Sequence, residues 1–399
     1  MSGFDGYDWE VTMASLFAKC EIRLSWLYLA LMFVPAGINN AHAREAKDIF
    51  HAKSSWGQEC AVSALDSSKQ AVIPEIFPVV IRGTPGRNLA SEQLYAPVMS
   101  IGYPFANLGS ACMAGNKGAC DQFSEWLDKL VNSDALKFDR EKHKGSQSSL
   151  VTGELAGNST LRPIAIYTSM LRRHNLISMS DRKEVFDWMR RRAANYSHIS
   201  GGENEGQLAQ NLVLSSAATQ LAVGITTSDD SLNGTAAKAY RAYIDTMRSD
   251  GSFPAESRRG QSALKYENNA IALLVLVAEL ELVKGVDLYS YRGPSGDIHK
   301  AIKFWIDALQ NESVILGYAA ENFAPTDPVQ PDGRQALHFL RPDRGMTQMG
   351  WVIPYMQNFP NRDNAKRIAK LIDQGKIQLP DDFDSILGVY PRCFWAMAE

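Results

Sequence analysis

The stretch at residues 250–282, DGSFPAESRRGQSALKYENNAIALLVLVAELEL, constrains the fold of this chain more than any other. It begins with Asp250 and Gly251, a pair typical of turns, and from Ser262 onward it consists of good helix formers. Residues 270–278 are apolar on every face of the expected helix, and a helix of that kind is buried on all sides. The sequence therefore predicts a fold built around one buried helix that carries polar side chains at its start.

Two of these polar side chains, Arg259 and Tyr266, are suited to holding a sugar ring. They are seven residues apart, which places them about 10 Å from each other on one helix face, or closer if the chain turns between them. That separation predicts one sugar ring between the guanidinium group and the phenol. Without a further motif, Tyr266 is better explained as a core tyrosine and Arg259 as an ion-pair partner of Glu256.

The same stretch contains the pattern D-G-x-x-P-x-E-x-x-R, then Y-x-N-x-A and L-V-x-x-A-E. It is formed by Asp250, Gly251, Pro254, Glu256, Arg259, Tyr266, Asn268, Ala270, Leu274, Val275, Ala278 and Glu279. This pattern resembles the core motif of the alginate lyase (mannuronate lyase) family. The resemblance implies an all-α fold, an α/α toroid (an incomplete α/α barrel) of helical hairpins. It also implies that Tyr266 and Arg259 are catalytic and that Asn268 binds substrate.

In the family, an earlier helix contributes an Asn-Asn-His motif. An alignment of equal length from Tyr266 places this motif at Gln210, Asn211 and Leu212. The resemblance therefore implies that Asn211 is the third catalytic residue and that Gln210 binds substrate. Leu212 replaces the family histidine, and Glu267 lies where the family often has a histidine after the tyrosine.

Trp351 and Tyr355 lie in a W-V-I-P-Y stretch that resembles a family segment near the sugar-binding cleft. Stacking on sugar faces would suit both rings, so we assign them to substrate binding, although packing in the core explains them equally well.

These residues suggest how a uronate polymer is cleaved by β-elimination. A base removes the proton at C5 and the glycosidic oxygen at C4 leaves, once Arg259 and Asn211 have neutralised the carboxylate. Tyr266, with its pKa lowered by the arginine, can take the proton and return it to the leaving oxygen, because both lie on one face in mannuronate and glucuronate. The alternatives are a binding protein without turnover, and a glycoside hydrolase that uses Asp250 and Glu256.

The N-terminus predicts export. Lys19 and Arg23 are followed by the apolar run LSWLYLALMFV, which is too short to span a bilayer comfortably, and then by an A-H-A site that ends at Ala43. We expect residues 1–43 to be a signal peptide that is cleaved after Ala43, which delivers the protein to the periplasm. Met13 is an alternative start that omits the acidic residues before it, and an uncleaved anchor is the alternative to cleavage.

The remaining residues 44–399 are expected to form one lyase-like domain. Removing the first 43 residues takes two basic and four acidic residues from totals of 41 and 44, which leaves a net charge of −1. Such a chain has no positive field to attract nucleic acid, so an anionic ligand must be held by local arginines. We expect an acidic polysaccharide as partner, no nucleic acid, no membrane contact after signal cleavage, no cofactor and a monomer.

Four cysteines remain after cleavage. Cys112 and Cys120 enclose a short glycine-containing segment and are expected to form a disulfide in an oxidising compartment, and Cys60 and Cys393 are a second candidate pair. A metal site is the alternative, but the spacing matches no zinc motif and no histidine is close in sequence.

The rest of the mature chain predicts helices joined by short loops. Their patterns place them at residues 121–131, 161–174 (with Pro163 in the first turn), 181–196, 206–223, 235–248, 297–309, 346–359 and 362–374. Residues 71–110 predict a long irregular stretch with room for a short helix, and residues 137–158 predict a mobile loop over a cleft. This succession favours an all-α fold, and periodicity alone also allows a helical solenoid.

Overall fold

This computed structural model describes residues 80–81, 98–179, 182–197, 211–321, 334–342, 346–379 and 382–395, all within one compact unit, Glu45–Glu399. The α-helices are α3 (Tyr103–Met113), α4 (Lys117–Asn132), α5 (Gln147–Arg173), α6 (Lys183–Asn195), α7 (Asn211–Thr227), α8 (Asp230–Asp245), α9 (Pro254–Ser257), α10 (Ala263–Leu282), α11 (Ile298–Gln310), α12 (Ser313–Ala319), α13 (Val352–Asn358), α14 (Asp363–Asp373) and α15 (Pro391–Phe394). The shorter helical turns are η2 (Val98–Gly102), η3 (Glu141–His143), η5 (Gly260–Ser262) and η6 (His338–Leu340).

Strands are few within these described ranges. They are β1 (Val80–Ile81), β2 (Lys137–Phe138), β3 (Met346–Thr347) and β4 (Phe383–Asp384). β1 pairs with β2 and β3 with β4, each in parallel, and each pair is only two residues long. The predicted all-α class is therefore confirmed.

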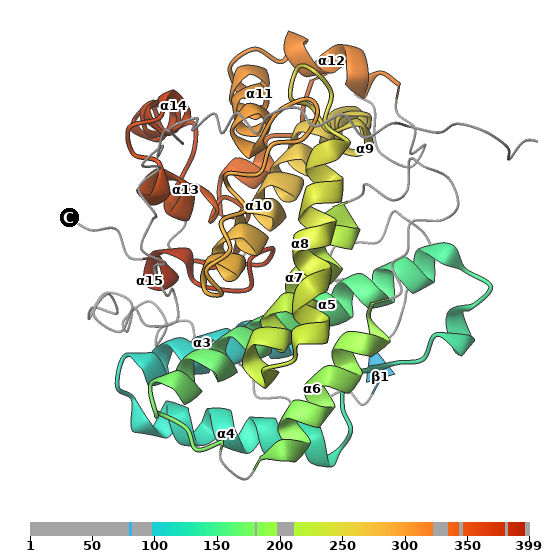
Figure 1. Ribbon diagram of the computed structural model, residues 1–399, viewed down its shortest axis with the longest axis vertical. Helices are drawn as coiled ribbons and strands as arrows, with labels where there is room; N and C mark the ends of the chain where they lie inside the picture. The colour runs from blue at the N-terminus through green and yellow to red at the C-terminus, as the bar shows by residue number, and fades with distance from the viewer. Residues whose placement is uncertain are drawn as a thin grey trace, which may run out of the picture. The chain divides into compact units, whose positions relative to one another are not determined.

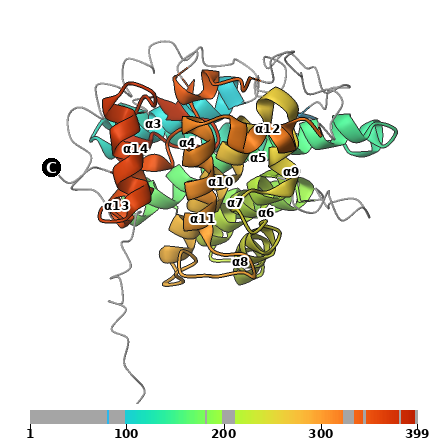
Figure 2. The same cartoon turned by 90° about the horizontal axis from the view of Figure 1, so that it is seen from above.

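The apolar helix α10 is the centre of the core. It packs against α7, α8, α9 and α11, and Figure 1 shows it among these neighbours. Every residue from Ala270 to Ala278 is at most 3% exposed, as its sequence predicts. Burying each Leu, Ile or Val side chain there contributes about 1.5–3 kcal/mol relative to exposure. α14 packs against both α11 and α13 (Figure 2).

The mobile loop predicted at residues 137–158 is wrong. β2 and η3 occupy its first part, and α5 begins at Gln147 and continues to Arg173. The helix predicted at residues 161–174 is therefore only the second half of α5, and Pro163 lies inside the helix instead of in its first turn.

Two glycines explain why this region resembled a loop in the sequence. A Cβ atom on Gly153 would lie 2.2 Å from the ring of Phe138, and one on Gly157 would lie 2.5 Å from the ring of Tyr196. Glycine thus occurs in α5 because aromatic rings lie directly against the helix backbone.

Most of the other predicted helices are confirmed with small shifts at their ends. The predicted apolar face at residues 121–131 is buried in α4, and α11 and α14 lie where the sequence places them, whereas α8 begins at Asp230 instead of residue 235 and ends at Asp245 instead of residue 248. The helix predicted at residues 346–359 is shorter, because β3 occupies its start and α13 begins only at Val352. Residue 181 and residues 206–210, where two helices were expected to begin, lie outside the described part of the chain.

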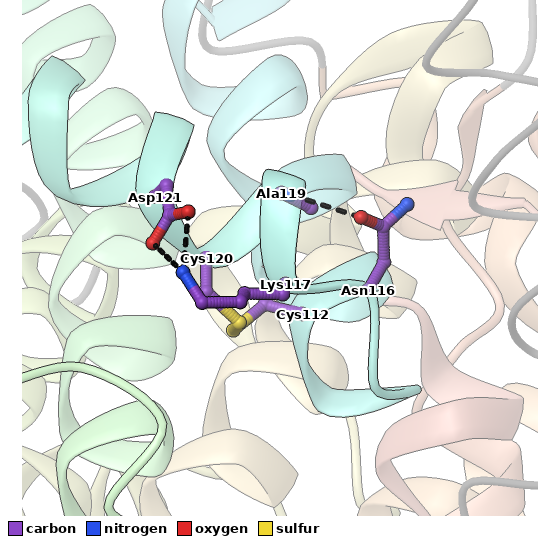
Figure 3. The surroundings of a disulfide bond; sticks show 6 residues. All are labelled: Cys112, Asn116, Lys117, Ala119, Cys120 and Asp121. Carbon is purple, nitrogen blue, oxygen red and sulfur yellow. Dashed lines mark hydrogen bonds and ion pairs between the residues drawn. A yellow bond between two sulfur atoms is a disulfide. The ribbon is translucent and has the colours of Figure 1, made fainter.

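The disulfide predicted between Cys112 and Cys120 is present and joins the end of α3 to the start of α4 (Figure 3). In the turn between them, the side chain of Asn116 accepts a hydrogen bond from the backbone N–H of Ala119 and caps α4. Cys393 also takes part in a disulfide. Cys60, its predicted partner, lies outside the described residues, so that pairing stays a prediction.

Candidate active site

A turn between α9 and α10 brings Arg259 against Tyr266. Gly260 has a φ of +55°, which favours glycine, and it begins η5, the short helix that leads into α10. Tyr266 lies in the first turn of α10. The guanidinium carbon of Arg259 is 3.8 Å from the centroid of the Tyr266 ring, and both side chains are partly exposed. The structure thus forms a cation–π pair at the start of the buried helix.

No room is left for the predicted sugar ring between Arg259 and Tyr266, and the closer approach expected if the chain turns between them is the one observed. The two groups touch, because η5 removes the separation that one continuous helix would have produced. A sugar ring cannot fit between two groups whose separation is 3.8 Å. Stacking of this kind is worth about 0.5–1 kcal/mol at exposed sites, and it holds the guanidinium group next to the phenol.

Glu256, three residues before Arg259, connects this turn to α7. Its side chain is buried, and its Oε1 accepts hydrogen bonds from the backbone N–H of Asn211 at 2.8 Å and from the hydroxyl of Tyr243 at 2.7 Å. Asn211 is the first residue of α7 and is itself buried. The structure therefore places Asn211 beside the segment that carries Arg259, and its catalytic role stays a prediction.

Glu267, the residue after Tyr266, faces the interior. It is fully buried, and its Oε1 accepts a hydrogen bond from the backbone N–H of Phe253 at 2.9 Å. Burial raises the pKa of Glu267 well above its usual value, and the negative charge of Glu256 acts in the same direction against the hydrogen bond from Phe253. Glu267 therefore ties the start of α10 to the residue that precedes α9.

Neither Glu256 nor Glu267 was among the predicted site residues. The available signal was their position, because acidic residues at the start of a fully buried helix need partners inside the protein. What the sequence does not show is which partners they find.

Asn268, predicted to bind substrate, is fully buried and bonded within the protein. Its Oδ1 accepts a hydrogen bond from Trp351 Nε1 at 2.8 Å, and its Nδ2 donates to the carbonyl of Gln348 at 2.8 Å. Trp351 is also fully buried and packs edge-on against Trp305, with ring centroids 5.5 Å apart. Asn268 and Trp351 therefore expose no surface to a sugar, and their hydrogen bond ties α10 to the residue that precedes α13.

Tyr355 is also fully buried. Its hydroxyl lies 3.0 Å from Nδ1 of His299 and accepts a longer bond from Asn364 Nδ2 at 3.4 Å. Burial raises the pKa of Tyr355 to about 12. The position of Tyr355 corresponds to the core-packing alternative, and sugar binding by this residue stays a prediction.

Gln210, the last predicted substrate-binding residue, lies outside the described residues. Leu212 is half-buried near the start of α7. Arg258, the neighbour of Arg259, forms an ion pair with Glu321 at 2.6 Å on a partly exposed face. The two adjacent arginines therefore differ, since one binds an acidic side chain and the other lies on Tyr266.

Among the described residues, no three His, Cys, Asp or Glu side chains are grouped closely enough to hold a metal ion. The helices in that same part of the chain include none that is both long and apolar enough to cross a membrane.

Comparison with known proteins agrees with this architecture. The family model described as "Alginate lyase" matches residues 111–315, which is half of the chain. A polysaccharide lyase from Stenotrophomonas maltophilia (strain K279a) is 31% identical over 133 residues, 33% of this chain and 40% of that protein. An alginate lyase from Azotobacter vinelandii is 26% identical over 185 residues, 44% of this chain and 45% of that protein. The matches thus span less than half the length of these curated relatives.

Solved structures of alginate lyases show the same fold. Alginate lyase A1-III from Sphingomonas species A1 superposes with a TM-score of 0.60 at 22% identity, covering 89% of this chain and 99% of that one. Another structure of the same enzyme, a variant in complex with a tetrasaccharide, gives a TM-score of 0.62. An alginate lyase from Bacteroides ovatus superposes with a TM-score of 0.57 at 13% identity, over 90% and 100% of the two chains. These likenesses confirm the predicted α/α toroid.

Proposed function

Because the chain belongs to the alginate lyase family, we propose that it is a polysaccharide lyase that cleaves a mannuronate- or glucuronate-type polymer by β-elimination. The observation that carries the proposal is the contact of Arg259 with Tyr266, 3.8 Å from guanidinium carbon to ring centroid. A cation on a partly exposed phenol favours the phenolate, which is the form a base needs.

We assign the residues the following roles. Arg259 and Asn211 bind the uronate carboxylate and offset its charge, so that the C5 proton becomes acidic enough to remove. Tyr266 takes that proton and returns it to the C4 oxygen as the glycosidic bond breaks. Glu256 links the two carboxylate-binding residues, since it accepts the N–H of Asn211 from a position three residues before Arg259.

The substrate class is supported by the relatives and by the charge of the chain. The relatives are named as alginate or polysaccharide lyases. The nearly neutral mature chain has no general attraction for polyanions, so selection of a uronate rests on local groups such as Arg259. An acidic polysaccharide encountered in the periplasm during exopolysaccharide turnover or secretion, after export and cleavage at Ala43, is the substrate that we propose.

A binding protein without turnover is the second candidate. It is favoured by Leu212, an apolar, half-buried side chain at the aligned position of the family histidine. A hydrolase is not favoured, because Glu256 is buried with its Oε1 already accepting two hydrogen bonds. Asp250 would also be a poor general acid. Although its partial burial raises its pKa, hydrogen bonds from Ser252 and Tyr318 outweigh that effect and lower it.

The direct test is to incubate the purified protein with polymannuronate, polyguluronate and polyglucuronate and to follow the ultraviolet absorbance of the unsaturated uronate end. A rise with the mannuronate or glucuronate polymer is expected. Binding without any rise would replace the lyase by the binding protein, and a new saturated reducing end would replace it by a hydrolase.

The variant Tyr266→Phe tests the base. It keeps the ring under Arg259 and removes only the hydroxyl, so turnover should be lost while polymer binding stays nearly intact. Tyr291→Phe is a matched control, because it removes a hydroxyl that binds Asp245 on the surface. A fully active Tyr266→Phe protein would exclude Tyr266 as the base.

A further inference from the structure

Glu267, the residue that follows the proposed base Tyr266 in the sequence, is not accessible to water. Glu267 is 0% exposed, and its Oε1 accepts the backbone N–H of Phe253. Its Oε2 is also buried and has no hydrogen-bond partner within the described part of the chain. An ionised carboxylate with one unsatisfied oxygen in such a place carries a large desolvation penalty, and the protonated form avoids most of it.

The charged and titratable groups that face Glu267 come from two helices and the turn between them. They are Tyr243 on α8, Arg248 and Asp250 in the turn, and Glu256 on α9. Arg248 is the cation in this set, and it already donates hydrogen bonds to the hydroxyls of Ser252 and Ser257. Two neighbouring carboxylates therefore oppose a further negative charge on Glu267, and Arg248, which is engaged by the two hydroxyls, forms no ion pair with it among the described residues.

Glu256 is better placed than Glu267 to be ionised. Its Oε1 accepts two hydrogen bonds, from the N–H of Asn211 and the hydroxyl of Tyr243. The charge of Arg259 reaches the same pocket, where it acts on Tyr243. Hydrogen-bond donors and a nearby cation stabilise a carboxylate, and among the described residues Glu267 has only one donor, the N–H of Phe253.

We propose that Glu267 is kept neutral by a bound proton and is a positioning residue for Tyr266. The neutral side chain still accepts the N–H of Phe253 and so fixes the start of α10 against the start of α9. A neutral Glu267 also adds no negative charge next to Tyr266. An ionised Glu267 would oppose the ionisation of the Tyr266 hydroxyl to a phenolate. The positioning role rests on the proposed lyase function, whereas the bound proton does not.

Infrared difference spectroscopy tests the proton directly. Burial raises the pKa of Asp384 to about 6, so this carboxyl group is ionised at about pH 8. At that pH the wild type should still show the C=O stretch of a buried protonated carboxyl group, which we assign to Glu267. Glu267→Gln should remove that band. Glu281→Gln is the matched control, since Glu281 is equally buried in α10 but is paired with Lys284 at 3.0 Å, and it should leave the band in place. A wild type without the band would overturn the proposal whether or not the variants fold.

The positioning role is tested by the pH profile of kcat/KM. Glu267→Gln keeps an acceptor for Phe253 and cannot ionise, so its loss of activity at high pH should begin at a higher pH than in the wild type. Glu267→Ala removes the acceptor and should reduce kcat by about tenfold or more with a smaller change in KM. Equal kcat values for the Gln and Ala variants, or superimposable alkaline limbs for Gln and wild type, would refute the role.

The two proposals fail in different ways. A band that disappears in Glu267→Gln, in a protein that cleaves no polymer, would sustain the bound proton and remove the lyase. Cleavage by a wild type that lacks the band would sustain the lyase and remove the proton.

Discussion

Replacing Asn268 by alanine separates a structural role from substrate binding. The side chain bridges Nε1 of the buried Trp351 and the carbonyl of the half-buried Gln348, each at 2.8 Å. Alanine leaves both without this bond, and each buried group that loses its partner costs about 1–3 kcal/mol. We therefore expect Asn268→Ala to lower the free energy of unfolding by about 2–6 kcal/mol.

Thermal and urea unfolding measure this loss. In the unit Glu45–Glu399, about 350 residues long, it corresponds to a fall in Tm of about 3–8 °C. Asn269→Ala is the matched control, because Asn269 is the next residue on the same helix, is partly exposed, and has an Oδ1 without a hydrogen-bond partner among the described residues. Its Tm should change by less than about 1 °C. An unchanged Tm for Asn268→Ala together with a raised KM would refute the argument from burial and make Asn268 a substrate-binding residue.

Raising the pH should destabilise the wild type more than Glu267→Gln. The pKa of Glu267 is higher in the native state, so the native state binds more protons than the unfolded state. The free energy of unfolding of the wild type therefore falls by up to about 1.4 kcal/mol per pH unit above pH ~4.3, until Glu267 ionises in the folded protein. Parallel curves of unfolding free energy against pH for the two proteins, measured in urea, would contradict this. Replacing Cys112 and Cys120 by serine should cost about 2.5 kcal/mol for a separation of eight residues, and an unchanged urea midpoint would speak against it. Leu212→His should raise kcat on polymannuronate if the leucine limits turnover, and no gain would show that this position does not set the rate.

Hydrophobic periodicity was sufficient to predict the helical class and the central buried helix, because both depend on which residues avoid water. It failed at α5, where Gly153 and Gly157 suggested a loop. Their real function is to let the rings of Phe138 and Tyr196 pack on the backbone. Such contacts join residues far apart in sequence, and no local pattern contains them.

The prediction of the site also succeeded where the signal is local in sequence and failed where it depends on the tertiary fold. The motif located Arg259 and Tyr266 correctly as a pair, but the distance between them depended on the turn at Gly260, which a helical spacing does not include. Trp351 and Tyr355 are predicted to bind substrate because their W-V-I-P-Y stretch resembles a family segment near the cleft and aromatic rings suit sugars, with core packing as the alternative. Their hydrogen bonds to Asn268 and His299 are what place them in the core, and these arise only from the tertiary fold.

Three consecutive residues of α10 have three different tasks. Successive side chains on a helix point about 100° apart, so Tyr266 can face the site while Glu267 and Asn268 point into the protein on other sides. Glu267 is bonded to Phe253 before α9, and Asn268 is bonded to Trp351 before α13. The helix that carries the proposed base is thereby held on two sides, by segments that meet only in the folded chain. A base held in this way is oriented before substrate binds, and this preorganisation is what proton abstraction from a weakly acidic carbon requires.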